Sequence, residues 1–303
     1  TLYIKDYTFI GDHYLMVIHD PDVRRNELVL LDQDLKTVEE HYGLGEEPIS
    51  LFTDCYGVKH YLTQNQACQV DFLDGELIVQ KVSRVEFDEV VRPCKVKLDN
   101  CYFFEGLVNK YVTTYYLIDA ESKRFKAMYS SMDSVAVGTL EDEALMPGRM
   151  VSPIYSDPQR AKYHAGLDQA YLEEIQCPES YVPLFKVGEE AVIFDHNRQT
   201  IYHFDQRGEV TFKTGTPYTE ERFWTREVLV DEDGKRAFTV FDRLGKITLG
   251  EINLDNGSIV RQWELPKKFV SNIQVKDGEI YFLYKDNNYD PVNRLYAFDM
   301  DWP

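Results

Sequence analysis

Basic, amide and imidazole side chains recur in the short polar segments that separate apolar runs along this chain. Arginine guanidinium groups can bind carboxylates or phosphates through two parallel hydrogen bonds, and amide and imidazole groups add hydrogen bonds to hydroxyls. The candidates in these segments are Arg24, Arg25, Asn65, Lys110, His196, Arg198 and Arg243. Together they predict a site for an anionic or polyhydroxylated ligand, unless they are ordinary polar loop residues.

The overall charge makes this local excess of basic groups worth pursuing. The chain carries 33 Lys and Arg against 52 Asp and Glu, a formal net charge of −19. A protein this acidic repels the phosphates of nucleic acids and of anionic membrane surfaces. We therefore expect no nucleic-acid partner, and no apolar run approaches the length of a transmembrane helix. The expected partner is a small molecule, a glycan or another protein.

The elements that would position the candidates show a repeat. An apolar, aromatic-rich strand ending in Asp, followed by a polar turn, recurs at spacings of about 42, 45, 86, 50 and 44 residues. The Asp residues that end these strands are Asp32, Asp74, Asp119, Asp205, Asp255 and Asp299. Asp, Asn and Gly after a strand are the residues that a tight reversal needs.

A repeat of this length is typical of the four-stranded blade of a β-propeller. Two intervals resolve into four strands each, at 182–187, 191–195, 200–205 and 209–213, and at 226–230, 236–241, 246–254 and 258–264. No segment of helical period connects these strands, which excludes a parallel βαβ sheet. The sequence predicts one all-β domain over residues 1–303, an antiparallel six-bladed propeller. We expect the N-terminal strand near residues 3–6 to close the ring beside the last blade.

The interval of 86 residues is twice the repeat, so a seven-bladed ring is the alternative. Residues 131–180 contain four prolines and lack the repeat, but hold one helical stretch from about 157 to 176. We interpret them as an insertion between blades three and four. In a propeller, the connections between blades and the turns between second and third strands lie at one end. We therefore expect Arg149 and His164 of the insertion to lie near the loop candidates at the channel mouth.

Other chemistry has little support in the sequence. The seven His residues lack the spacing of a zinc site, and residues 286–290 lack the Gly and Glu of a calcium loop, so we expect no metal and no cofactor. No Gly-x-Ser-x-Gly nucleophile motif occurs, and catalytic residues cannot be assigned.

The five Cys residues lack the number and spacing of a disulfide framework. We expect mostly free thiols, with room for one bridge. A turn at residues 99–100 would set Leu98, not Cys94, opposite Cys101.

Two short motifs carry a resemblance to a known family. The hairpin Val-Leu-Val-Asp-Glu-Asp-Gly-Lys-Arg-Ala-Phe-Thr-Val at residues 228–240 resembles the strand–Asp-Gly-Lys–strand hairpin of TolB-like propellers. The segment Tyr-Gly-Leu-Gly-Glu-Glu-Pro at residues 42–48 is similar to a Gly-x-Gly-x-x-Pro connection in uncharacterised TolB-like six-bladed propellers of Bacteroides-type bacteria. The resemblance implies export to the periplasm or cell envelope, often with a lipid anchor, here upstream of Thr1. It implies no catalytic residues.

These observations lead us to expect a ligand-binding or protein-interaction propeller of the cell envelope. The alternative is an enzyme of the glycosidase or lyase kind, which would act on an anionic or carbohydrate substrate at the channel mouth. Two inward carboxylates about 5–9 Å apart would favour that enzyme.

Overall fold

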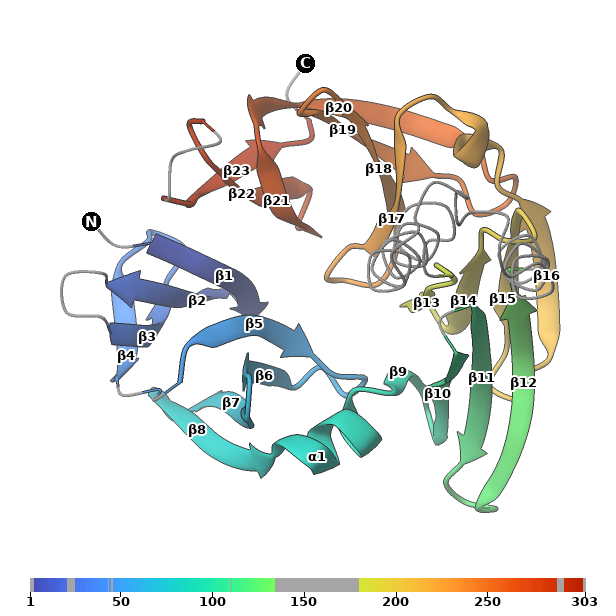
Figure 1. The fold of residues 1–303 in the computed structure, drawn as a ribbon, viewed down its shortest axis with the longest axis horizontal. Helices are drawn as coiled ribbons and strands as arrows, with labels where there is room; N and C mark the ends of the chain where they lie inside the picture. The colour runs from blue at the N-terminus through green and yellow to red at the C-terminus, as the bar shows by residue number, and fades with distance from the viewer. Residues whose placement is uncertain are drawn as a thin grey trace, which may run out of the picture.

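The computed structural model describes residues 3–20, 25–42, 44, 46–109, 111–133, 180–287 and 292–301. Their strands form six antiparallel blades arranged in chain order around a ring, which confirms the predicted six-bladed propeller (Figure 1). Five blades have four strands and the sixth has three among these residues.

The first three blades occupy the N-terminal half of the chain. Blade 1 comprises β1 (Tyr3–Ile10), β2 (His13–Asp20), β3 (Arg25–Leu31) and β4 (Thr37–Tyr42). Blade 2 comprises β5 (Pro48–Thr53), β6 (Lys59–Thr63), β7 (Gln66–Leu73) and β8 (Glu76–Ser83). The short helical turns α1 (Arg84–Glu86) and η1 (Phe87–Val91) lead to blade 3. Blade 3 comprises β9 (Cys94–Leu98), β10 (Cys101–Asn109), β11 (Val112–Asp119) and β12 (Arg124–Met132).

The remaining blades follow residues 134–179, which lie outside the described part of the chain. Blade 4 comprises β13 (Leu184–Val187), β14 (Glu190–Asp195), β15 (Thr200–Phe204) and β16 (Val210–Gly215). The 3-10 turn η3 (Pro217–Glu220) precedes blade 5, which comprises β17 (Trp224–Val230), β18 (Ala237–Arg243), β19 (Lys246–Ile252) and β20 (Ile259–Lys268). Blade 6 comprises β21 (Val270–Lys276), β22 (Glu279–Tyr284) and β23 (Arg294–Asp299). The strands of blades 4 and 5 agree with their predicted ranges to within a few residues.

The hydrophobic core lies between neighbouring blades, because successive side chains of a strand point to opposite faces of its sheet. Strand β18 shows this directly. Ala237 and Phe241 pack with residues of blade 4 such as Phe194, whereas Phe238 and Val240 pack with blade 6. A blade therefore needs apolar residues on both faces, which explains the continuous apolar runs in its middle strands.

The interval of 86 residues does not hold a seventh blade between blades 3 and 4. The innermost strands of these blades, β9 and β13, are in direct contact. Val96 and Phe103 of blade 3 share one buried cluster with Leu184 and Ile193 of blade 4. Because blades 3 and 4 are neighbours, the ring closes with six blades.

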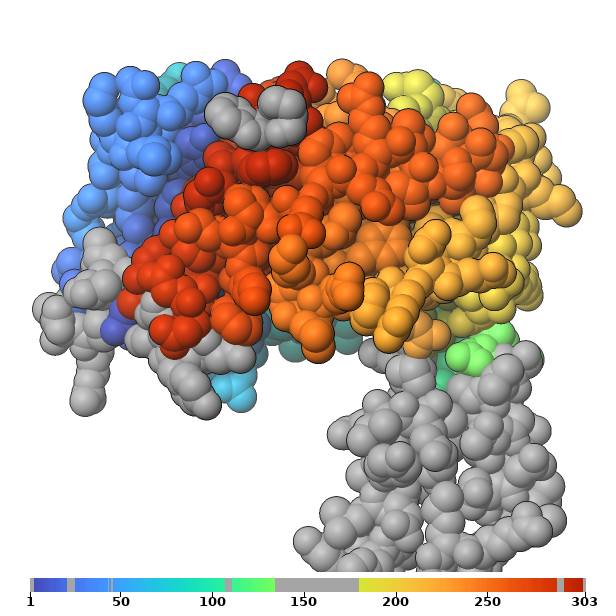
Figure 2. All heavy atoms as spheres, turned by 90° about the horizontal axis from the view of Figure 1, so that it is seen from above, coloured from blue at the N-terminus to red at the C-terminus, as the bar shows by residue number. Residues whose placement is uncertain are grey.

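Ring closure brings β1 beside the last blade, as expected. β1 does not join the sheet of that blade, however, because it pairs with β2 as the innermost strand of blade 1. The Tyr7 hydroxyl donates to the Asn272 carbonyl at 2.9 Å, and Gln274 Nε2 donates to the Tyr7 carbonyl at 2.8 Å. Seen from its edge, the ring shows blade 6 in red packed against blade 1 in blue (Figure 2). These contacts join the two ends of the chain without a shared blade.

One disulfide joins Cys55 of blade 2 to Cys94 of blade 3, with a Cα–Cα distance of 5.6 Å. Cys101 lies opposite Leu98 in the β9–β10 pair, as the turn at residues 99–100 predicted, and it is a free thiol together with Cys68. Cys177 lies outside the described residues. Over that described part of the chain, no helix is long and apolar enough to cross a membrane.

Candidate functional site

The antiparallel strand order gives the propeller two distinct ends. One end, here the connection face, carries the turns between second and third strands and the connections between blades. The other end, the turn face, carries the turns between first and second strands. The predicted site residues that the structure describes belong to segments of the connection face; they are Arg25, Asn65, His196, Arg198 and Arg243. Arg24, Lys110, Arg149 and His164 lie outside the described residues, so their part in the site stays a prediction.

His196 is enclosed by aromatic rings. Its ring stacks on Tyr181 at an interplanar angle of 2° and lies 4.8 Å from the ring centroid of Trp224. Nδ1 donates to the Tyr181 carbonyl at 3.1 Å, so Nε2 accepts from the Tyr218 hydroxyl at 2.9 Å. Burial lowers the pKa of His196 to about 4, which keeps the ring neutral. This arrangement fixes blade 4 to blade 5.

Arg198 lies beside a polar contact between blades 3 and 4. Its guanidinium sits 5.4 Å from the ring centroid of Tyr129 and donates to the Tyr129 hydroxyl at 3.1 Å. That hydroxyl donates in turn to the fully buried carboxylate of Asp195 at 2.6 Å. Burial and the neighbouring carboxylate raise the pKa of Tyr129. Arg198 is about half exposed, and the part of its guanidinium group that faces the protein is directed at Tyr129 and Asp195.

Arg25 and Asn65 are held within blades 1 and 2. Arg25 pairs with Glu27 at 2.5 Å and lies 4.6 Å from the ring centroid of Tyr42. Asn65 donates to Glu46 through its side chain at 3.0 Å and through its backbone N–H at 3.1 Å. Both residues therefore have internal partners, which a ligand would have to replace.

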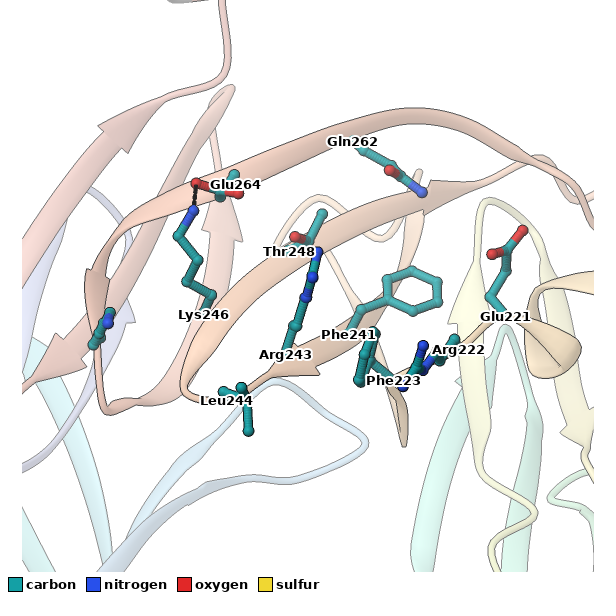
Figure 3. Close-up of a pocket in the computed structure, with 11 residues that line it drawn as sticks. Glu221, Arg222, Phe223, Phe241, Arg243, Leu244, Lys246, Thr248, Gln262 and Glu264 are labelled. Atoms are coloured by element: carbon teal, nitrogen blue, oxygen red, sulfur yellow. Dashed lines mark hydrogen bonds and ion pairs between the residues drawn. The ribbon is translucent and has the colours of Figure 1, made fainter.

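Arg243 lines a cavity of about 530 Å³ in blade 5 (Figure 3). This blade-5 cleft is lined by Glu221, Arg222, Phe223, Phe241, Arg243, Leu244, Lys246, Thr248, Gln262, Glu264 and Lys268. Register explains the gathering, because Phe241, Thr248 and Glu264 face one another across β18, β19 and β20. Arg243 and Lys268 both lie opposite Lys246 in the next row. One sheet face thus presents a cross-strand row of basic residues.

Two guanidinium groups in the blade-5 cleft lack a carboxylate partner among the described residues. The Arg222 guanidinium lies 4.7 Å from the ring centroid of Phe223, and that of Arg243 lies 5.7 Å from the same ring. An aromatic face holds a guanidinium without using its hydrogen-bond donors. Both arginines are therefore positioned and still free to bind an anion.

The acidic residues of the cleft do not face each other. Glu264 pairs with Lys246 at 2.5 Å, and Figure 3 shows Glu221 at the opposite end of the cleft. A glycosidase needs two carboxyl groups on either side of one bond. This cleft does not offer that pair. No three His, Cys, Asp or Glu side chains within the described ranges come together as a metal site.

The turn face holds a second cavity, of about 810 Å³, at the mouth of the channel. Lysines from five blades line it: Lys59, Lys95, Lys97, Lys186, Lys235 and Lys276. Seven carboxylates line it as well: Asp12, Asp54, Glu189, Asp231, Glu232, Asp233 and Asp277. Because these carboxylates offset the lysines, the cavity carries no excess of positive charge. It does not suit an anionic ligand as well as the blade-5 cleft does.

The hairpin turn between β17 and β18 crosses this channel mouth. Gly188 of blade 4 donates to the Gly234 carbonyl at 2.6 Å, and Glu232 donates through its backbone to Val275 of blade 6 at 2.8 Å. The Glu232 carboxylate pairs with Lys59 of blade 2 at 3.1 Å. Sequence reasoning recognised this turn, with Gly234 at positive φ, but not its position across the channel.

Sequence reasoning also missed Arg222 and Phe223, which precede a strand whose start was predicted at residue 226. The preceding 3-10 turn and the positive φ of Phe223, 76°, carry no clear sequence signal.

Asn197 was missed too. Its side chain donates to Ser131 at 3.1 Å and to Ser180 at 2.8 Å, and so joins the two flanks of residues 134–179.

No family model and no curated protein match this sequence. Among solved structures, the chain is similar to the designed protein Ika8 (TM-score 0.35, 10% identity, 97% of this chain and 71% of that one). It is also similar to the extracellular domain of BT4673 from Bacteroides thetaiotaomicron (TM-score 0.42, 11% identity, 100% and 36%). A third is an acylaminoacyl peptidase of Pyrococcus horikoshii (TM-score 0.46, 14% identity, 99% and 51%).

The chain thus spans about a third of the BT4673 chain and about half of the peptidase. At such low identity, and with TM-scores below 0.5, these likenesses indicate no family, activity or ligand.

Proposed function

We propose that this protein is an exported binding propeller that recognises an anionic ligand at the blade-5 cleft. The observation that carries the proposal is the pair of guanidinium groups, Arg222 and Arg243, held against Phe223 without a carboxylate partner in the described part of the chain. In a chain of net charge −19, two unneutralised arginines in one cleft concentrate positive potential where a ligand can enter.

The rest of the cleft suits binding better than catalysis. Lys268 adds a further cation, Gln262 and Thr248 offer neutral polar groups, and Phe241 forms part of the apolar wall. Sites of this kind combine an apolar wall with a few polar groups that orient the ligand. The Lys246–Glu264 pair neutralises the carboxylate that lies closest to the basic row.

Export is the second part of the proposal. Disulfides persist in oxidising compartments such as the periplasm and are rare in the cytosol. The Cys55–Cys94 bridge therefore supports a position in the periplasm or cell envelope. The hairpin at residues 228–240 and the connection at residues 42–48 support membership of the TolB-like propellers, and with it the same location.

The remaining predictions of site and domain stay part of this proposal. We infer that residues 131–180 form an insertion of a single propeller domain, because Asn197 joins Ser131 to Ser180 beside blade 4. The insertion then starts on the connection face. Arg24, Lys110, Arg149 and His164 are proposed to extend the site from there, together with Arg25, Asn65, His196 and Arg198.

The test is binding of a carboxylate polymer at low ionic strength. Fluorescein-labelled hexa-aspartate and an oligoglucuronate serve as probes, read by fluorescence anisotropy and by titration calorimetry. We expect at least one probe to bind, and Arg222→Gln and Arg243→Gln each to weaken it by about tenfold, because a charge-assisted hydrogen bond contributes about 1.5–3 kcal/mol.

Arg207→Gln is the matched control, because Arg207 is an exposed arginine on the turn face, away from the cleft. It should leave the affinity unchanged. Equal affinities of wild type and the Arg222→Gln/Arg243→Gln double variant for both probes would refute the proposed site.

A further inference from the structure

Three large apolar residues of the connection face share an unfavourable backbone conformation. Phe223, Leu244 and Phe269 have φ angles of 76°, 56° and 55°. They are also 37%, 91% and 36% exposed. A bulky residue with positive φ is rare in proteins, and such residues gather at functional sites. The three form what we term the Leu244 surface.

The three residues lie next to one another. Phe223 and Leu244 both line the blade-5 cleft. Leu244 is followed by Gly245, where an added Cβ would lie 3.7 Å from the ring of Phe269. Lys268, the neighbour of Phe269 in the chain, lines the cleft as well. The Leu244 surface therefore borders the basic cleft, because Phe223 and Leu244 line it and Phe269 adjoins the turn that carries Leu244.

Leu244 is placed against the preference of its turn. The turn from Arg243 to Lys246 joins β18 and β19, and both of its central residues, Leu244 and Gly245, have positive φ. Asn, Asp and Gly are the usual residues at the first central position, because a bulkier side chain with positive φ is crowded against the backbone there. A leucine that is 91% exposed in this position stabilises neither the turn nor the core.

We propose that the Leu244 surface docks an acidic polypeptide segment that carries a large apolar side chain. The apolar side chain is buried among Phe223, Leu244 and Phe269, and its flanking carboxylates bind Arg222 and Arg243. This inference rests on the proposed function for the part played by the two arginines. It adds the class of partner, a protein or peptide.

Two features favour a polypeptide over the other anionic partners. A glycan has no large apolar side chain with which to cover Leu244. An anionic membrane is an extended surface that meets the net charge of −19 over a whole face of the protein, whereas a short acidic segment meets mainly the local excess of basic residues in the cleft. A cavity of about 530 Å³ also suits an inserted side chain better than a bilayer surface. Aromatic and arginine side chains around a pocket are also the residues that dominate the binding energy of protein interfaces.

The experiment compares two labelled hexapeptides of equal charge, Asp-Asp-Leu-Leu-Asp-Asp and Asp-Asp-Ser-Ser-Asp-Asp, by fluorescence anisotropy. We expect the leucine peptide to bind about tenfold more tightly, as two buried leucines readily supply this factor. Leu244→Asn should reduce the ratio of the two affinities to within about twofold. The same variant should leave the serine peptide unaffected and should not lower Tm.

Leu35→Asn is the matched control. Leu35 is also an exposed leucine with positive φ, 61°, in a turn of blade 1 on the turn face, and no other exposed apolar residue of this conformation adjoins it within the described chain. This variant should keep the wild-type ratio of affinities.

Equal affinity for both peptides, with Arg222→Gln still weakening each, would overturn this inference and leave the proposed function standing. If Arg222→Gln weakens the binding of neither peptide, this result would count against the proposed function itself. Tighter, Leu244-dependent binding to phosphatidylserine vesicles than to the leucine peptide would replace the polypeptide partner with a membrane.

Discussion

Lys59 of blade 2 and Glu232 of blade 5 form an ion pair across the ring, with Nζ and Oε1 3.1 Å apart. Blades 2 and 5 are three positions apart in a ring of six, so the pair joins opposite sides of the propeller. The Lys59 side chain is only 10% exposed and also donates to Thr53 at 3.0 Å. The β17–β18 turn thus fixes the channel mouth in addition to closing a hairpin.

Removing the Glu232 charge should destabilise the propeller. Glu232→Gln leaves the ammonium group of Lys59 buried without a counter-charge. Breaking a buried pair costs about 3–5 kcal/mol, and we expect about 2 kcal/mol here because Glu232 is one-third exposed. Urea unfolding measures the loss. Glu189→Gln, an exposed residue of the same cavity, should change little, and an equal loss in both variants would show that the ion pair is unimportant.

His196 should make the protein sensitive to acid. Its pKa is about 4 in the folded state and about 6.5 in an unfolded chain, so the unfolded state binds the proton first. The stability contributed by the neutral ring is complete above pH 6.5 and is lost as the pH falls towards 4. The loss amounts to about 3 kcal/mol.

The unfolding free energy of wild type and His196→Gln should be measured from pH 7.5 to pH 4.5. The variant should be less stable at pH 7.5, because Gln lacks the ring that stacks on Tyr181. It should also show a shallower decline between pH 6.5 and 4.5. Parallel curves for the two proteins would rule out the contribution of His196.

The disulfide should contribute to stability as well as report on the compartment. The Cys55–Cys94 bridge closes a loop with a sequence separation of 39 residues. A loop of this length restricts the unfolded chain by about 4 kcal/mol. Cys55→Ser should lower the unfolding free energy by up to this amount, whereas Cys101→Ser should lower it much less. Peptide mapping without reductant should recover one peptide pair joined through Cys55 and Cys94.

The turn leucines should be replaceable with a gain in stability. Asn adopts positive φ more readily than Leu, so Leu244→Asn and Leu35→Asn should each stabilise the protein by about 1 kcal/mol. For a domain of this size, the gain corresponds to a rise in Tm of about 2 °C. Calorimetry of the two variants checks this. A fall in Tm for Leu244→Asn alone would mean that Leu244 packs within the folded protein.

Much of the fold could be predicted because it repeats locally. The strand–Asp–turn pattern sets the blade length, and the alternating apolar residues of strands such as β18 set both packing faces. Hairpin register followed from turn residues, which is why Cys101 was correctly placed opposite Leu98. The position of the cleft could not be predicted, because Arg222 precedes the first strand of blade 5 and Lys268 ends its last strand, and the two come together only in the folded blade.

The sequence by itself determined the β-propeller, its antiparallel blades and the assignment of the basic loops to one end. Those properties depend on short-range patterns, namely strand periodicity and turn chemistry. Only the tertiary structure decided between six and seven blades and paired Cys55 with Cys94. It also showed that Arg243 lines a cleft, whereas His196 is enclosed by aromatic rings. Each of these outcomes depends on which blades become neighbours and on what then surrounds a side chain. Burial and charge pairing between distant segments leave no pattern in the local sequence, so they could not be predicted from it.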